Sequence, residues 1–153
     1  MSKTKLQVSA IKEGTVIDHI PAKDLFKVIR ILNLNESENQ ITFGTNLDSV
    51  ALGKKAIIKI SEKFFKEEEI NKIALVAGEA NLNIIKNYNV VEKKKVVIPD
   101  KIIGIAKCVN PKCITNNEEI TTKFTVVSKD KVALKCDYCE KITDKENIII
   151  LRK

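Results

Sequence analysis

The sequence predicts an α+β protein in two parts, an antiparallel sheet with two helices followed by a small all-β module that holds a metal. Three observations support this prediction. Residues 1–100 contain alternating apolar runs on both sides of two helix-like apolar stripes. Pro99 and Asp100 mark a junction, after which residues 101–153 contain only short strand-like runs. Four cysteines fall in this second part as two close pairs.

The first part is expected to open with two short strands and a helix. Residues 6–21 alternate in apolar character, with a break at Gly14 and an end at Pro21. Apolar residues at spacings of three and four over 22–32 predict a helix with one core-facing stripe. A polar turn over 33–39 follows.

The rest of the first part is expected to complete a sheet. The helical stripe of the second helix ends before Gly78. The resulting order is strand, helix, strand, strand, helix, strand, with an extra hairpin arm, and this is the ferredoxin-like split pattern. The predicted strands cover residues 40–47, 54–60, 81–86 and 90–98, and the second helix covers residues 66–77.

The second part, residues 101–153, is expected to be a zinc-ribbon-like all-β module. Its second cysteine pair follows a strand directly, as at the tight turn of such a ribbon. A module of about fifty residues is too small for a large apolar core, and a metal commonly supplies the missing stability at that size. The predicted strands cover residues 102–107, 122–127, 131–135 and 147–151.

The cysteine spacing predicts one zinc ion per chain, held by Cys108, Cys113, Cys136 and Cys139. Two short-spaced pairs separated by a hairpin can close a tetrahedron of thiolates. Four unrelated buried thiols and two disulfides are the alternatives. Unrelated core cysteines have no reason to fall into two tight pairs, and a sequence without a secretory segment is not placed in an oxidising compartment.

The predicted zinc is structural rather than catalytic. A catalytic zinc keeps one position open for water, whereas four sulfurs fill every position here. The chain's single histidine, His19, lies far upstream in the sequence and has no obvious nucleophile partner. The rival interpretation is an enzyme whose active site lies in the ferredoxin-like part. The sequence offers no pair of acid and base residues at a spacing that indicates such a site.

The net charge of +7 raises the alternative of a zinc-ribbon nucleic-acid-binding protein. The excess comes from lysine, since Arg30 and Arg152 are the only arginines, and arginine is the preferred reader of guanine and phosphate. The lysines alternate with acidic residues, which is typical of a solvated surface. No apolar run approaches the about 20 residues of a membrane helix, and no signal peptide is recognised, so the cytoplasm is the expected location.

Several strings resemble the regulatory chain of aspartate carbamoyltransferase. The most specific is Gly14-Thr-Val-Ile-Asp-His-Ile-Pro21, preceded by Leu6-Gln-Val and Ala10-Ile-Lys. Further matches are Ile41-Thr, Gly44, Asn46-Leu47, Lys59-Ile60, Asn87-Tyr88, Val90-Val91 and Ala133-Leu-Lys-Cys-Asp-Tyr-Cys-Glu-Lys141. The resemblance covers nearly the whole chain in order.

The resemblance implies a non-catalytic subunit. Members of that family pair into regulatory dimers that hold catalytic trimers in a larger assembly and control the first committed transfer of pyrimidine synthesis. The amino-terminal domain is implied to bind nucleoside triphosphates (ATP, CTP and UTP), and the zinc domain to dock the catalytic chain. Asn110, Glu140 and Lys141 match family positions near that catalytic-chain contact.

The resemblance also implies an effector site. The matching residues are Ile11, Val16, Asp18, His19, Lys59, Asn83, Tyr88, Val90 and Lys93. Their chemistry suits a nucleotide, because lysines can meet phosphates and Asp18 can accept from ribose hydroxyls. Taken singly, a lone histidine on a strand is more often packed or capping, and a single lysine is more often solvated. Strand alternation would let Lys95 point the same way as Lys93.

Overall fold

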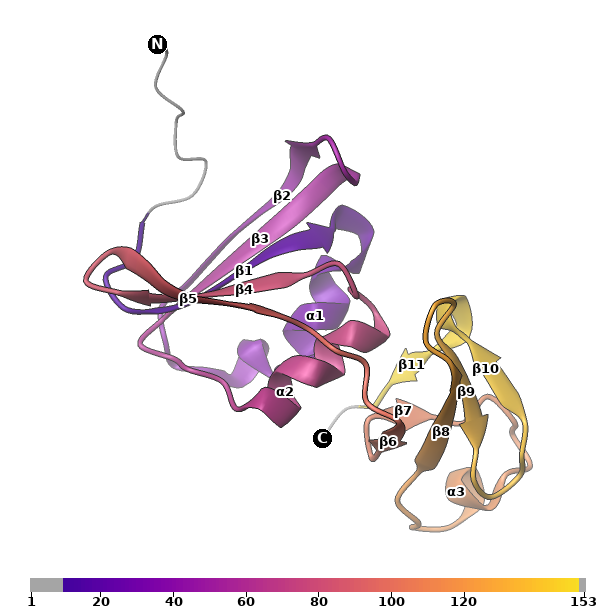
Figure 1. Ribbon diagram of the computed structural model, residues 1–153. Coiled ribbons are helices and arrows are strands. Elements are labelled where there is room, and N and C mark those ends of the chain that lie inside the picture. Colours follow the sequence, from indigo (N-terminus) through magenta and orange to yellow (C-terminus); the bar gives the residue numbers. More distant parts are fainter. Residues whose placement is uncertain (1–9, 152–153) are drawn as a thin grey trace.

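The computed structural model describes residues 10–151, and their largest element is a five-stranded antiparallel sheet (Figure 1). Its strands lie in the order β2-β3-β1-β4-β5, in which β2 and β3 form one hairpin and β4 and β5 form another. The strands are β1 (Gly14–Pro21), β2 (Ile41–Ser49), β3 (Gly53–Ser61), β4 (Asn81–Lys86) and β5 (Asn89–Lys95).

Two helical segments cover one face of this sheet (Figure 1). Helix α1 (Leu25–Ile31) follows a short 3-10 turn after β1, and α2 (Glu67–Asn71) continues as a 3-10 turn to Leu75. Further short 3-10 turns lie at Leu34–Glu36 and Lys145–Asn147. The connectivity β1-α1-β2-β3-α2-β4 is the predicted split pattern, and β5 is the extra arm. The α+β prediction is therefore confirmed.

Strand alternation separates a dry face of the sheet from a polar one. Ile17, Ile58 and Leu82 lie on three neighbouring strands, and none of them is exposed. They pack toward the helices, whose Leu25 and Ile73 are also fully buried. Burying each such side chain contributes about 1.5–3 kcal/mol, so this layer fixes the register of the sheet. The residues between them necessarily point to the opposite face.

Two predictions for the first part were wrong in detail. Residues 10–13 form no strand, and the remainder of that expected strand, residues 6–9, lies outside the described part of the chain. The predicted helix over 66–77 is α-helical only to Asn71. Residues 73–77 are all buried, so this segment has no solvent-facing side and tightens into a 3-10 turn against the core.

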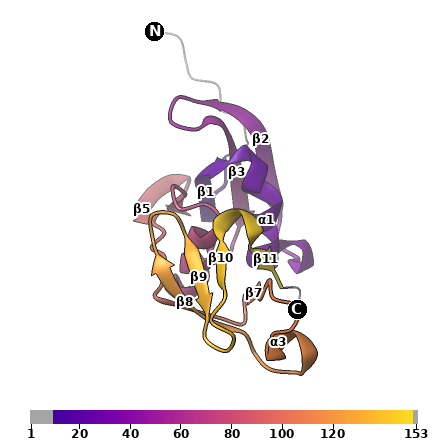
Figure 2. The same cartoon turned by 90° about the vertical axis from the view of Figure 1, so that its right-hand side faces the viewer.

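The second part contains a four-stranded antiparallel sheet in the order β10-β9-β8-β6 and a separate pair of β11 with β7 (Figure 2). A single helical turn, α3 (Ile114–Asn117), follows the first cysteine pair. The strands are β6 (Lys101–Ile103), β7 (Ala106–Lys107), β8 (Lys123–Ser128), β9 (Ala133–Cys136), β10 (Ile142–Asp144) and β11 (Ile149–Ile150).

The strand predicted over 102–107 is divided at Gly104. That glycine has φ +70°, in the left-handed region, and its N–H donates to the carbonyl of Thr122 at 2.8 Å. The chain therefore leaves the four-stranded sheet and pairs as β7 with the distant β11. Strand β11 also contacts α1, which joins the two parts of the molecule. Among the described residues, no helix has the length and apolar character needed to cross a membrane.

Candidate functional site

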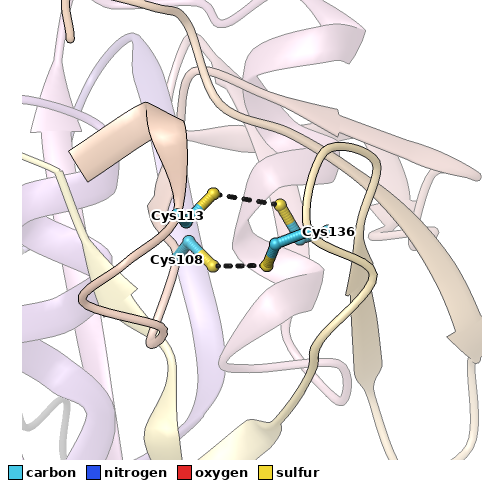
Figure 3. A group of neighbouring side chains, drawn as sticks. Cys108, Cys113 and Cys136 are labelled. Atoms are coloured by element: carbon cyan, nitrogen blue, oxygen red, sulfur yellow. Dashed lines mark hydrogen bonds between the residues drawn. The ribbon is translucent and has the colours of Figure 1, made fainter. Parts of the chain in front are cut away.

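Four cysteines meet where two loops of the second part face each other. Cys108 follows β7 and Cys113 precedes α3, while Cys136 ends β9 and Cys139 follows it in a tight turn. Figure 3 shows Cys108 and Cys113 approaching from one loop and Cys136 from the other. The prediction that the two pairs converge is confirmed, because all four sulfurs lie within 4.8 Å of one another.

The sulfur positions fit a tetrahedral metal. The Sγ atoms of Cys108 and Cys139 are 3.6 Å apart, and those of Cys113 and Cys136 are 3.7 Å apart. A zinc tetrathiolate with bonds of about 2.3 Å has sulfur–sulfur edges of about 3.8 Å. A disulfide needs about 2.05 Å, so these sulfurs are not bridged in pairs. The donor set therefore suits a thiophilic ion in a closed site.

Asparagine side chains fix the loop between the first two cysteines. Asn116 Nδ2 donates to the carbonyls of Cys108 (2.9 Å) and Asn110 (2.7 Å). Asn117 Nδ2 donates to the carbonyl of Cys113 at 2.9 Å, and Asn110 Oδ1 accepts from the N–H of Lys112 at 3.0 Å. The loop is thus held from α3, which starts directly after it. None of these contacts was predicted from the sequence.

The thiols differ in acidity because they differ in burial and in hydrogen bonding. Burial raises the pKa of Cys108 to about 12 and also raises the pKa of Cys136. Burial opposes ionisation of Cys139 as well, but hydrogen bonds from the Lys141 backbone and the Asn110 side chain bring its pKa down to about 7. Since metals bind thiolates, an ion entering this site must displace protons from Cys108 and Cys136.

The second candidate site lies on the sheet face that the helices leave uncovered. One row of cross-strand partners runs through Thr42, Lys59, Val16, Asn83 and Lys93, from β2 to β5. Four of these five residues are in the predicted effector set. Burial lowers the pKa of Lys59, and the Asp18 carboxylate partly offsets that shift. Lysine ammonium groups, the side-chain amide of Asn83 and the apolar side chain of Val16 therefore lie on the same face of the sheet.

Asp18 and His19 line a hollow of about 390 Å³ at one end of this row. A β-bulge displaces the strand at His19, whose φ is +61°. Asp18 accepts from the His19 N–H at 2.6 Å and pairs with Lys55 at 3.1 Å, while the buried His19 Nδ1 lies 3.6 Å from Asp18 Oδ1 and has no hydrogen-bond partner in the described structure. The other lining residues are Asn81, Asn83, Lys93, Lys94 and Lys95.

Ile11 and Tyr88 line a second hollow, of about 640 Å³, which Thr42 of the same row also lines. The Tyr88 N–H donates to the carbonyl of Lys12 at 3.0 Å, which joins the β4–β5 turn to the segment before β1. Val90 lies in β5 opposite Ile85 and is 48% exposed. Six members of the predicted set thus line one of the two hollows, whereas Val16 and Lys59 lie in the middle of the row and Val90 lines neither hollow.

Register separates the three consecutive lysines. Lys93 pairs with Asn83 and Lys95 pairs with Asn81, so both belong to the uncovered face. Lys94 lies opposite Leu82 and so alternates to the other face, where it pairs with Glu92 at 3.8 Å, although it still borders the edge of the hollow. Sequence reasoning named neither Asn81 nor Lys55 as a lining or neighbouring residue. Period-two spacing from Asn83 was the signal that could have identified Asn81.

The three predicted interface residues surround the metal centre. Asn110 is half-buried between Cys108 and Cys113, whereas Glu140 and Lys141 are exposed just after Cys139. Glu140 has φ +64°, and its N–H donates to the Cys136 carbonyl at 2.9 Å, which closes the turn. Their role in partner contact stays a prediction.

Comparison with known proteins covers both halves of the chain. Residues 6–97 match the family model of the aspartate carbamoyltransferase regulatory chain, allosteric domain, and residues 100–149 match that of its metal binding domain. The chain belongs to the aspartate carbamoyltransferase regulatory chain family. The matched metal binding domain contains all four converging cysteines, and the matched allosteric domain contains the whole cross-strand row.

Relatives in this family extend over nearly the full chain. Regulatory chains of Bacteroides thetaiotaomicron and Bacteroides fragilis are 56% and 55% identical over 150 residues, covering 98% of each chain. The regulatory chain of Pyrococcus horikoshii is 54% identical over 147 residues, covering 95% of this chain and 97% of its own. The resemblance inferred from the sequence strings is confirmed, and with it the assignment to a non-catalytic chain.

Proposed function

We propose that this chain binds nucleoside triphosphates on its uncovered sheet face and docks catalytic trimers through a zinc-stabilised domain, so that it regulates aspartate carbamoyltransferase in pyrimidine synthesis. The observation that carries the proposal is the cross-strand row of Lys59, Val16, Asn83 and Lys93 within a chain of this family. ATP, CTP and UTP are the expected effectors.

The dimensions and chemistry of the row suit a nucleotide. The row crosses from Thr42 on β2 to Lys93 on β5 in four strand-to-strand steps of about 4.8 Å, or about 19 Å in all. Ile11 and Tyr88 supply apolar surface and backbone groups at one end for the base. Lys93 and His19 supply donors at the other end for phosphates, and Asp18 lines the same hollow as an acceptor for the ribose. Lys59, in the middle of the row, can meet either the base or the sugar.

Regulation follows from binding that differs between two quaternary states. An effector shifts an assembly only through its differential affinity for those states. Substrate binding must then change effector affinity by the same factor, typically worth about 1–3 kcal/mol. Purine and pyrimidine triphosphates compete for the same row, and each spaces the flanking strands differently.

The cysteine-containing domain attaches the chain to the catalytic trimers in this proposal. Four thiolates leave no open position, so a zinc ion here stabilises the fold and takes no part in a reaction. The loops that it fixes present Asn110, Glu140 and Lys141 to the catalytic chain. The regulatory chains pair with one another, and sedimentation of the purified 17.2 kDa chain should show a dimer. A monomer over the whole concentration range would contradict the pairing.

Lys59→Ala tests the nucleotide site. We expect CTP and ATP affinity, measured by calorimetry, to fall about tenfold or more, because a half-buried cation is lost from the row. Lys54→Ala is the matched control on the same strand, since Lys54 pairs with exposed Asp48 at 2.6 Å. Zinc content and dimer mass should not change in either variant. Equal affinity in Lys59→Ala and the native chain would remove Lys59 from the site.

A further inference from the structure

A closed ring of polar contacts holds the second cysteine turn from outside the metal site. Lys101 Nζ donates to Thr125 Oγ1 at 2.7 Å and to Asp137 Oδ2 at 3.1 Å. Thr125 Oγ1 in turn donates to Asp137 Oδ1 at 2.7 Å. The three residues come from β6, β8 and the Cys136–Cys139 turn. We call them the Lys101–Thr125–Asp137 cluster.

The cluster is better organised than an ordinary surface ion pair. A single exposed pair contributes about 0.2–1 kcal/mol, because its side chains must be ordered for one contact. Here Asp137 uses both carboxylate oxygens, and its side chain is 30% exposed. Its N–H also donates to the Lys123 carbonyl at 2.9 Å. Asp137 is therefore fixed at its backbone and at both side-chain oxygens.

Fixing Asp137 bears directly on a metal ligand. Asp137 directly follows the ligand Cys136, and the turn it opens is closed by the Glu140 N–H, which donates to the Cys136 carbonyl at 2.9 Å, and by the Cys136 N–H, which donates to the Lys141 carbonyl at 3.0 Å. These bonds persist, and the Cys136 sulfur keeps its direction, only while the turn keeps its conformation. Groups that orient metal ligands from behind commonly change metal affinity about 10–100-fold when removed.

We propose that the Lys101–Thr125–Asp137 cluster positions the Cys136–Cys139 turn for metal binding and slows the loss of the metal. The cluster also reaches the junction between the two parts of the chain, because Lys101 opens β6 directly after Pro99 and Asp100. The first cysteine loop is held differently, by the asparagines of α3. The two halves of the metal site thus have independent supports.

Zinc transfer from the full-length chain to a chromophoric chelator measures this positioning. Thr125→Val removes the bridging hydroxyl but keeps the side-chain shape, and we expect zinc release about tenfold faster than in the native chain. Thr125→Ser retains the hydroxyl and should release zinc within about twofold of the native rate. Lys101→Gln removes the cation from the same ring of contacts and should also make zinc release faster than in the native chain.

Lys129→Gln is the matched control, because Lys129 pairs with exposed Asp100 at 2.8 Å next to the same strand. It should leave zinc release unchanged. Cobalt-substituted protein gives a second readout, since the thiolate-to-cobalt absorption should change in Thr125→Val but not in Thr125→Ser. Native release rates in both Thr125→Val and Lys101→Gln would overturn the proposal, and so would equal acceleration by Lys129→Gln.

Discussion

The two sheets of this chain reach a fixed shape by different means. The five-stranded sheet buries a continuous apolar layer against two helices, with Ile17, Ile58 and Leu82 at its centre. The four-stranded sheet buries only a few large side chains of its own, chiefly Ile102, Phe124 and Leu134. Four sulfurs lie beside them where a larger protein would place more apolar residues. The first sheet is therefore stabilised mainly by buried apolar area, whereas the second is small enough to rely on the metal that its four sulfurs are placed to bind.

Removing one metal ligand should have the largest effect and should separate the two parts. Cys136→Ser is expected to abolish tight zinc binding and unfold residues 101–151, because metal binding to such small sites is worth on the order of 10 kcal/mol. The first sheet should stay folded and keep the nucleotide affinity proposed above. Zinc analysis, hydrogen exchange and sedimentation with catalytic trimers would measure these outcomes. Protection of β8 and β9 at the native level in the zinc-free variant would contradict the comparison.

A cavity in the first sheet should destabilise the first part of the chain and leave the second part unchanged. Leu82→Ala removes a fully buried side chain from β4, and we expect the first part to lose about 3 kcal/mol of unfolding free energy. The metal content should stay at the native level. Val91→Ala on exposed β5 is the control and should change stability little. Denaturant unfolding monitors the result, and loss of zinc together with the first sheet would show that the two parts unfold as one.

Removing a support of the first cysteine loop should have the smallest effect of the three. Asn116→Ala deletes two hydrogen bonds, to the carbonyls of Cys108 and Asn110, and should lower the stability of the zinc-bound second part by about 1–2 kcal/mol. Asn116→Asp keeps the size but turns a carboxylate toward those carbonyls, so its loss should be at least as large. Thermal unfolding with zinc bound distinguishes the variants. Native stability in both would show that the loop needs no such support.

The sequence determined the outline of the fold where side chains report burial. Alternation identified β3 and β4 to within a few residues because each has one buried face, and it also located β2, although that edge strand has no buried residue. It failed where a backbone conformation decides the path, as at Gly104, where one left-handed residue divides an expected strand between two sheets. It also failed over residues 73–77, which are buried on every side and so carry no periodicity.

The metal centre was easier to predict than the nucleotide face. Cysteine has few roles in tight pairs, so spacing alone indicated four converging sulfurs. A lysine has many roles, and although strand alternation already placed Lys93 and Lys95 on one face, only the register shows that they lie opposite Asn83 and Asn81. The left-handed bulge at His19 is invisible to strand alternation, because the motif continues through it as if the strand were regular.

The pairing of β7 with β11 has a consequence for biosynthesis. All four sulfur ligands leave the ribosome before residues 149–150, yet β7, which leads directly into Cys108, has β11 as its partner strand. The nascent chain therefore carries every ligand while one arm of the site still lacks its neighbour. Chains truncated before residue 149 would keep every cysteine, but the strand that leads into Cys108 would lack its partner. Such truncated chains should therefore contain less bound zinc than the full-length chain when they are purified.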